Sequence, residues 1–304
     1  MIYFHEMMLS GNQIELRHLQ YFLAVAEELH FRKAAERLFI TQPGLSRQIL
    51  RLEEILGVQL FERDKRNVKL TPAGLILQEE AGELLRRTHQ LIDQVRRIDR
   101  GEAGELRLGF VGSAMQSLLP GILRRMNVVL PDVHTNLEEM GNEEQIQALL
   151  ADQIDLGFIR SARLPKGLNW QSVQIDSFSV VLPADHALHQ GNFESVAQLR
   201  DEDFILFSRD YSHGYYDLVM SIFEDVGLTP SISHKSVHAT TIFRLVESGL
   251  GVSIVPTDLQ KGFQLDVRFI KLNQIPQRTT LSAVWKGENR NPILPNVLDF
   301  LPKL

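Results

Sequence analysis

The stretch Phe31–Leu70, FRKAAERLFITQPGLSRQILRLEEILGVQLFERDKRNVKL, decides the fold of the N-terminal region. It contains two short helical patterns, Phe31–Leu38 and Thr41–Leu56, separated by a tight break, and a basic, turn-like segment follows at Arg63–Asn67. Thr41 is a suitable N-cap for the second of these helices, and Gly57 is a suitable terminator. The pattern predicts a winged helix-turn-helix, whose second helix lies in the major groove of DNA.

The predicted second helix has one apolar and one polar face. At about 100° per residue, Leu45, Ile49 and Leu52 share the core face. Arg47 points the other way and could donate two hydrogen bonds to a guanine. The wing would lie between strands at Val58–Phe61 and Val68–Leu70, and its cations would reach phosphates or a minor groove. Which side chains contact bases and which contact phosphates is left open. The residues expected at DNA are Arg32, Thr41, Gln42, Pro43, Ser46, Arg47, Arg51, Arg63, Lys65 and Arg66.

A long helix is predicted from Thr71 to about Asp99, because apolar or small residues recur at alternating spacings of four and three. A heptad seam of this kind favours pairing with a second copy, although the helix could instead pack on its own domain. The segment Arg100–Gly104 resembles a hinge. The seam residues expected in a dimer are Leu77, Ala81, Leu84, Leu91, Val95 and Ile98.

Beyond residue 104, predicted strands and helices alternate, which indicates α/β lobes with parallel strands. Strands are expected at Leu106–Val111, His134–Glu138 and Ile154–Ile159, with a helix starting near Gln116. The expected organisation is an extension at 1–14, a winged helix-turn-helix (mainly α) at 15–71, a linker helix at 72–100 and an effector domain at 105–304. Lobe I would comprise about 105–178 and 279–304, and lobe II about 179–278.

The bulk composition is that of a globular protein without disulfides. The 304 residues include no cysteine, which fits a reducing compartment, and no apolar run is long enough to span a bilayer. We therefore expect a cytoplasmic protein. The net charge is −6, but between residues 32 and 69 nine basic residues face five acidic ones, so this segment carries +4 and the remainder −10. A basic face on an acidic protein suffices for contacts with DNA phosphates.

Several motifs resemble those of LysR-type transcriptional regulators. In the first 75 residues these are LRHLQYFLAVAEELHF at Leu16–Phe31, AAERLFITQPGLSRQI at Ala34–Ile49, LEEILGVQLFER at Leu52–Arg63 and LTPAG at Leu70–Gly74. Weaker matches to the family's effector domain are GELRLGFVG at Gly104–Gly112, DLGFI at Asp155–Ile159 and GLGVSIVP at Gly249–Pro256. The segments EELHF and GFVGS are most similar to the branch that senses aromatic or other organic carboxylates.

This resemblance implies a two-lobed effector domain like the type II periplasmic binding proteins, with a small organic acid bound in the cleft. It also implies double-stranded operator DNA, further copies of the chain as a dimer of dimers, and RNA polymerase as partners. Ser113 and Ala114 carry over as ligand residues at a helix start, where backbone N–H groups bind anions. An apolar ligand body would lie against Phe110, Met115 or Phe158. The expected effector residues are Ser113, Ala114, Asn142, Arg160, Ser208, His238 and Thr240, although each polar one could equally be a helix cap or a satisfied loop group.

Two other classes of protein remain to be weighed. The C-terminal two thirds alone would suit a solute-binding protein, but we see no signal peptide and the chain carries a DNA-binding head. An α/β enzyme would need a catalytic constellation, and no nucleophile–base pair or phosphate-binding glycine loop is visible. The pair His186 and His189 has metal-like spacing but no accompanying carboxylate pair, so we expect neither a metal site nor a cofactor.

Overall fold

The computed structural model describes residues 13–63, 67–160, 164–262 and 264–304. Most of the predicted extension and the wing residues Lys65 and Arg66 lie outside these ranges. The chain divides into two compact units, residues 1–96 and 97–304. The elements of the first unit are α2 (Leu16–Glu28), α3 (Phe31–Arg37), α4 (Gln42–Leu56), β1 (Phe61–Arg63), β2 (Val68–Leu70) and most of α5 (Pro72–Asp99).

The helix-turn-helix prediction is confirmed, together with its caps. Thr41 Oγ1 accepts a hydrogen bond from Gly44 N (3.3 Å) at the start of α4. Gly57 ends α4 in the left-handed conformation, with φ of 68°. The helices enclose one apolar core, in which Leu45 and Ile49 are fully buried. These caps fix both ends of α4, so the orientation of its outer face is set by the local sequence.

The first predicted strand of the wing, Val58–Phe61, is wrong in its bounds. The strand β1 begins only at Phe61 and pairs antiparallel with β2, so that Arg63 lies opposite Val68. The N–H groups of Leu60 and Phe61 donate instead to Glu53 Oε1, at 2.8 and 3.2 Å. The pairing partner of this backbone is therefore a side chain of α4.

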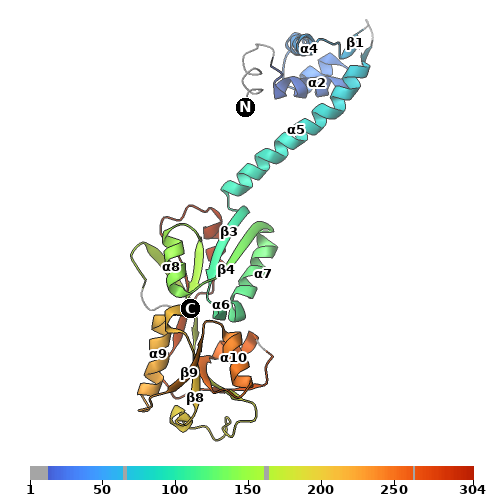
Figure 1. Ribbon diagram of the computed structural model, residues 1–304. Helices are drawn as coiled ribbons and strands as arrows, with labels where there is room; N and C mark the ends of the chain where they lie inside the picture. Colours follow the sequence, from blue (N-terminus) through green and yellow to red (C-terminus); the bar gives the residue numbers. More distant parts are fainter. Residues whose placement is uncertain (1–12, 64–66, 161–163, 263) are drawn as a thin grey trace. The chain divides into compact units, whose positions relative to one another are not determined.

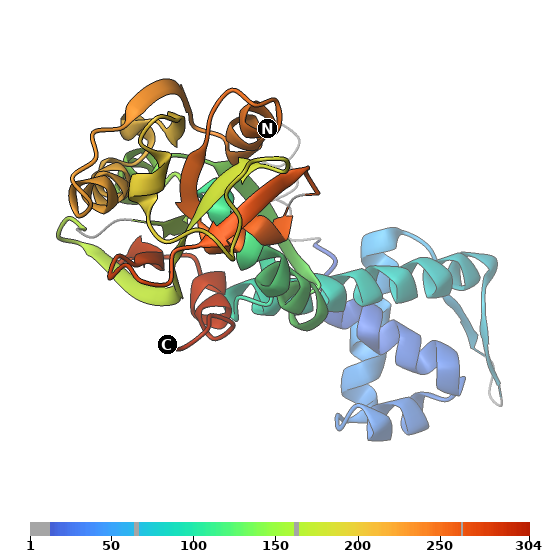
Figure 2. The same cartoon turned by 90° about the horizontal axis from the view of Figure 1, so that it is seen from below.

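The long helix α5 is continuous, as Figures 1 and 2 show. Thr71 caps its start by accepting from Gly74 N (3.0 Å). A side chain at Gly74 would place its Cβ 2.3 Å from Leu60 O, so only glycine fits there. At the other end, Gly101 N donates to Ile98 O and Glu102 N to Arg97 O, which is the Schellman pattern of a helix terminus.

The predicted hinge-like segment after α5 is not a loose loop. Asn296 Nδ2 donates to the carbonyls of Arg100 (2.9 Å) and Gly101 (3.1 Å). Gly101 has φ of 68°, and a Cβ there would lie 2.1 Å from Pro292 O. The segment is therefore packed tightly against the helix that contains Asn296.

The second unit has two α/β lobes, as predicted. Lobe I has a five-stranded sheet in the order β4-β3-β5-β12-β6. The strands β3, β4 and β5 run parallel, whereas β12 is antiparallel to both its neighbours, so the sheet is mixed. The helix α8 packs on one face of it and α7 on the other (Figure 1), and α11 shares the apolar cluster of α7. The elements are β3 (Ala103–Phe110), α6 (Gly112–Ser117), α7 (Leu119–Val129), β4 (Asp132–Glu139), α8 (Asn142–Leu150), β5 (Leu156–Ile159), β6 (Leu168–Asp176), β12 (Thr279–Lys286) and α11 (Ile293–Leu298).

Lobe II has an antiparallel sheet in the order β10-β7-β11 and a parallel pair β8-β9. A bridge between Phe204 and Val252 joins the two. The helices α9 and α10 pack on separate apolar clusters of this lobe. The elements are β7 (Phe178–Pro183), η1 (Val196–Leu199), β8 (Asp203–Phe207), η2 (Arg209–Tyr211), α9 (His213–Glu224), β9 (Ser231–Ser236), α10 (Ala239–Glu247), β10 (Ser253–Pro256), η3 (Thr257–Gly262) and β11 (Val267–Lys271).

Three strands, β6, β9 and β11, were not expected from the sequence, and the first helix of lobe I starts at Gly112 rather than near Gln116. The strand β9 has the polar sequence SISHKS and lies mostly exposed, so it lacks the apolar alternation that marks a strand. Within the described residues, we find no helix that is both long and apolar enough to cross a bilayer.

Candidate DNA-binding surface and ligand pocket

The outer face of α4 is exposed and presents Arg47. Leu45, Ile49 and Leu52 on the inner face are fully buried, as predicted. Arg47 is exposed and, within the part of the chain that the structure describes, has neither a hydrogen-bond nor an ion-pair partner. Its guanidinium is therefore available to a ligand. The other predicted residues at this end of α4 are exposed at Thr41, Gln42 and Pro43 and half-buried at Ser46.

Two further arginines of this surface form weak ion pairs with neighbours on their own helices. Arg32 Nε lies 3.0 Å from Glu36 Oε1, and Arg51 Nη1 lies 3.5 Å from Glu54 Oε2. All four side chains are largely exposed, and exposed pairs contribute little free energy. Either arginine can therefore exchange its partner for a DNA phosphate.

Arg63 is placed differently from the prediction. Its Nη2 donates to Glu53 Oε2 (3.0 Å), and its guanidinium lies 4.8 Å from the centre of the Phe31 ring. The Glu53 side chain is only 10% exposed and also accepts from the backbone N–H groups of Leu60 and Phe61. Arg63 thus fastens β1 to α4 and α3, rather than projecting as a free cation.

The predicted seam of α5 is only partly exposed. Leu77 packs against the helix-turn-helix core and Ala81 is buried, because the first turns of α5 complete the domain's own core. The later seam positions are exposed, and most of their neighbours on this part of the helix are polar or charged, although Ile92 is an exposed apolar residue as well. Their exposed fractions are 48% for Leu84, 60% for Leu91, 58% for Val95 and 44% for Ile98.

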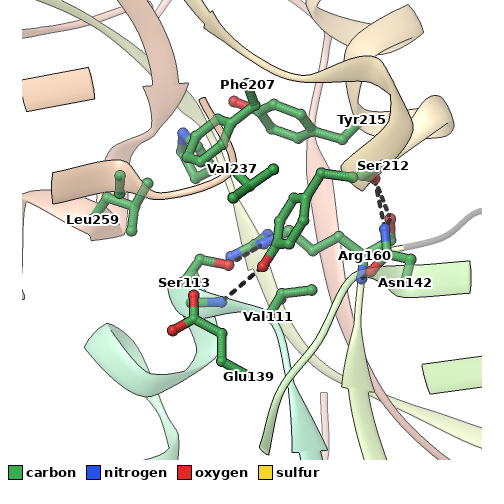
Figure 3. A pocket seen from close by; sticks show the side chains of 14 residues that line it. Val111, Ser113, Glu139, Asn142, Arg160, Phe207, Ser212, Tyr215, Val237 and Leu259 are labelled. Carbon is green, nitrogen blue, oxygen red and sulfur yellow. Dashed lines mark hydrogen bonds between the residues drawn. The ribbon is translucent and has the colours of Figure 1, made fainter. Parts of the chain in front are cut away.

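A pocket lies between the two lobes of the second unit (Figure 3), and we call it the interlobe pocket. Its cavity volume in this structure is 40 Å³. Polar groups gather on the lobe I side, and aromatic and aliphatic side chains gather on the lobe II side. The lining residues are Val111, Gly112, Ser113, Glu139, Asn142 and Arg160 from lobe I, and Phe207, Tyr211, Ser212, Tyr215, Val237, Ala239, Pro256 and Leu259 from lobe II.

Arg160 is the only positive charge among these lining residues, and it is buried, with 7% of the residue exposed. Its Nε donates to Ser113 Oγ (2.9 Å) and its Nη1 to Thr279 Oγ1 (3.2 Å). Its Nη2 is buried without a hydrogen-bond partner among the described residues. Burial lowers the pKa of Arg160, and the nearby Asp176 carboxylate opposes that shift. A buried guanidinium with an unused donor is costly unless an acceptor reaches it.

Hydrogen bonds join the two lobes at the pocket. Asn142 Nδ2 donates to Ser212 Oγ (2.5 Å), and the Asn142 amide also binds the backbone N and O of Arg160. Tyr211 Oη accepts from Gly112 N at 3.3 Å. Burial raises the pKa of Tyr211 to about 12, so its hydroxyl stays neutral. The backbone N–H at the start of α6 is thus occupied in this arrangement of the lobes.

The structure brings Ser113, Asn142 and Arg160 together in this pocket, but four other predicted residues lie outside it. Ala114 is fully buried, and its N–H donates to Val111 O, because α6 starts about four residues earlier than predicted. Ser208 precedes the η2 turn and does not line the pocket. His238 and Thr240 are exposed, while their neighbours Val237 and Ala239 line the pocket instead.

The predicted apolar wall is also wrong. Phe110 and Phe158 belong to the lobe I core, with Met115 packed against it, because their strands are covered by α6, α7 and α11. The apolar side chains that line the pocket come from lobe II, among them Phe207 and Tyr211. The sequence carried one signal for Tyr211 and Tyr215, since the aromatic run Tyr211–Tyr216 lies shortly after the end of β8 and leads into α9.

Comparison with known families matches both units. Residues 16–75 match the bacterial regulatory helix-turn-helix proteins of the lysR family, and residues 99–303 match the LysR substrate binding domain. The chain is 37% identical over 285 residues to the HTH-type transcriptional regulator AlsR of Bacillus subtilis (strain 168), covering 94% of each protein. It is 37% identical over 265 residues to the HTH-type transcriptional regulator BenM of Acinetobacter baylyi, covering 86% of this chain and 85% of BenM.

Solved structures agree. The crystal structure of CbnR, a LysR family transcriptional regulator, matches with a TM-score of 0.84 at 30% identity, over 94% of this chain and 99% of CbnR. Full-length CbnR complexed with its target DNA matches with a TM-score of 0.82 at 30% identity, over 95% and 98%. These are regulators and not enzymes. The chain therefore belongs to the LysR family of DNA-binding transcriptional regulators, with an effector-binding domain after its helix-turn-helix.

Proposed function

We propose that this regulator responds to a small organic carboxylate bound in the interlobe pocket. The observation that carries the proposal is the buried Arg160 guanidinium, which lacks an ion-pair partner among the described residues and leaves Nη2 without an acceptor. A carboxylate offers two acceptor oxygens in the geometry of a guanidinium fork. Ser113 and the Gly112 N–H would supply further donors.

The other residues that line the pocket determine which ligand body can accompany the carboxylate. Phe207, Tyr211 and Leu259 offer apolar surface, and Glu139 is the one carboxylate of the lining. An apolar ligand body would lie against the aromatic and aliphatic side chains, and a second ligand carboxylate would be repelled by Glu139. A monocarboxylate with an aliphatic or aromatic body therefore fits better than a dicarboxylate.

Ligand binding would change the arrangement of the lobes. The cavity of 40 Å³ has room for little more than water, so a larger ligand has to displace side chains. The carboxylate would compete with Tyr211 Oη for Gly112 N and with Ser113 Oγ for Arg160. Because the ligand replaces contacts between the lobes, it has different affinities for the two arrangements, which is the requirement for a switch.

We further propose that Arg47 reads a base edge and that Arg32, Arg51, Lys65 and Arg66 contact phosphates. The exposed seam of α5 would pair two copies, and two such dimers would form a tetramer on a promoter, where RNA polymerase is the partner. Pairing places two recognition helices on one DNA molecule, as a two-fold site requires.

The test is fluorescence anisotropy with the DNA upstream of the gene, with and without acetate, butyrate, benzoate and succinate, and calorimetric titration of the same acids. We expect at least one monocarboxylate to bind with saturation and to alter DNA affinity. Absence of binding by every acid, with DNA binding intact, would remove the carboxylate proposal while leaving the family assignment unaffected.

A further inference from the structure

A second cavity borders Arg160 on the side formed by the start of α9, and we call it the α9 pocket. Its volume is 140 Å³. It is lined by Arg160, Gly214, Tyr215, Arg278, Thr279 and Thr280, with Leu218 as its aliphatic side. The described residues that line this space thus include two arginines and no acidic residue, whereas those of the interlobe pocket include Glu139.

Backbone donors of α9 add to this positive charge. The helix has 12 residues, and Ser212 at its N-cap makes no side-chain cap bond. The Ser212 hydroxyl instead interacts with Asn142 Nδ2 (2.5 Å) and with Arg160 O (3.5 Å). The first-turn N–H groups of α9, to which Gly214 and Tyr215 belong, therefore have no side-chain acceptor within the described chain, and the helix dipole favours an anion there.

The buried Arg160 side chain is a second reason, separate from the start of α9, to expect an anion in this pocket. It is more than nine-tenths buried and lines this pocket, its Nη1 donates to Thr279 Oγ1 (3.2 Å), and its Nη2 has no acceptor among the residues described. The carboxylate of Asp176 acts on it only at longer range and accepts from Asp258 N (3.0 Å). Nothing in the described residues therefore neutralises Arg160 by direct contact.

We propose that the α9 pocket binds a small oxyanion. Guanidinium groups, helix-terminal N–H groups and threonine hydroxyls are the donors that recognise phosphate, sulfate and carboxylate oxygens. The chemistry is shared by inorganic oxyanions and by the carboxylate of a small metabolite. Since Arg160 borders both pockets, an anion here and a ligand in the interlobe pocket share one guanidinium. Each then weakens the binding of the other, and the coupling is reciprocal.

The experiment is calorimetric titration of the full-length protein with sodium phosphate and, in a second arm, with sodium acetate, both against sodium chloride at equal ionic strength. The diagnostic variant is Arg278→Gln, because Arg278 is exposed and belongs to the α9 pocket alone. The matched control is Arg200→Gln, another exposed arginine of lobe II. A second variant, Thr280→Asp, places a carboxylate in the cavity.

We expect wild type to bind at least one of the two anions. Arg278→Gln should weaken binding about tenfold or more by removing a charge-assisted donor, and Thr280→Asp should abolish it. Arg200→Gln should bind as wild type does. The two arms tell an inorganic oxyanion from a carboxylate. No binding by wild type, unchanged affinity in both Arg278→Gln and Thr280→Asp, or an equal loss of binding in Arg200→Gln would overturn the proposal.

Discussion

The Glu53 side chain should stabilise the start of strand β1, and the adjacent Glu54 side chain should contribute far less to the stability of the domain. Glu53 Oε1 accepts from Leu60 N and Phe61 N, and its Oε2 accepts from Arg63 Nη2 at 3.0 Å. Its side chain is 10% exposed and that of Arg63 is 31% exposed. The Glu54 side chain is 69% exposed and forms an ion pair with Arg51 at 3.5 Å. The two adjacent carboxylates thus form a natural pair of test and control.

The magnitude follows from the number of donors that lose their acceptor. In Glu53→Gln the amide oxygen can still accept from the backbone, but a charged hydrogen bond of ~1.5–3 kcal/mol becomes a neutral one of ~0.5–1.5 kcal/mol, a loss of about 1 kcal/mol. In Glu53→Ala two backbone N–H groups and the guanidinium lose their acceptor at ~1–3 kcal/mol per buried group, and partial exposure brings the sum to about 2–4 kcal/mol. Glu54→Gln should cost less than about 0.5 kcal/mol.

The assay is hydrogen exchange, followed by mass spectrometry, of the peptide that covers Leu60 and Phe61 in the full-length protein. Exchange reports the local free energy of opening, so about 1 kcal/mol appears as roughly a fivefold faster rate and 2–4 kcal/mol as roughly 30-fold or more. We expect the order Glu54→Gln, Glu53→Gln, Glu53→Ala. Equal exchange rates in Glu53→Ala and Glu54→Gln would refute the claim that the Glu53 side chain stabilises the start of β1.

Three further predictions concern a strained loop residue, the exposed seam of α5 and one hydrogen bond of the interlobe pocket. Phe39 is 96% exposed and has φ of 57°, a left-handed conformation that costs a residue with a side chain ~1–2 kcal/mol. Phe39→Gly removes this strain but adds ~0.5–1 kcal/mol of backbone entropy cost. The net effect should be a more stable protein with a higher urea midpoint of unfolding. The double variant Leu84→Glu with Leu91→Glu should sediment as a monomer, because it places charge on the exposed seam of α5. The control Ile76→Glu lies off the seam, at a residue that is 67% exposed, and should leave the dimer intact. An intact dimer in the double variant would disprove pairing through the seam. Ser113→Val removes the acceptor of Arg160 Nε and should abolish the effect of an identified carboxylate on DNA affinity without changing DNA binding itself; equal carboxylate affinity in both proteins would exclude Ser113 from the site.

The sequence predicted the DNA-binding domain well because its signals are local. Thr41, Gly57 and the apolar stripe of α4 each act within a few residues, and each is found as predicted. The role of Arg63 could not be predicted in this way. Its partner Glu53 lies ten positions earlier and itself looks like a solvated residue of an amphipathic helix. Only the packing of β1 on α4 brings the two together.

The pocket was harder to predict because it is made by contacts between distant segments. Ser113, Asn142 and Arg160 each stand at the end of a strand or the start of a helix, which is a local signal. The lobe II side depends on the η2 turn, which moves the contact from Ser208 to Tyr211 and Ser212. No periodicity in the sequence marks such a turn. The burial of Arg160 likewise depends on strands and helices from both lobes.

The role of the α4 helix in DNA recognition is tested most directly at Arg47, which we expect to read the DNA sequence. Fluorescence anisotropy would compare the affinities of wild type, Arg47→Ala and the exposed control Arg86→Ala for the upstream DNA and for a scrambled sequence. Loss of a bidentate base contact costs ~1–3 kcal/mol, so we predict that Arg47→Ala lowers the ratio of the two affinities by about tenfold or more, while Arg86→Ala keeps it. An unchanged ratio in Arg47→Ala, with the protein folded, would contradict the assignment of α4 as the recognition helix.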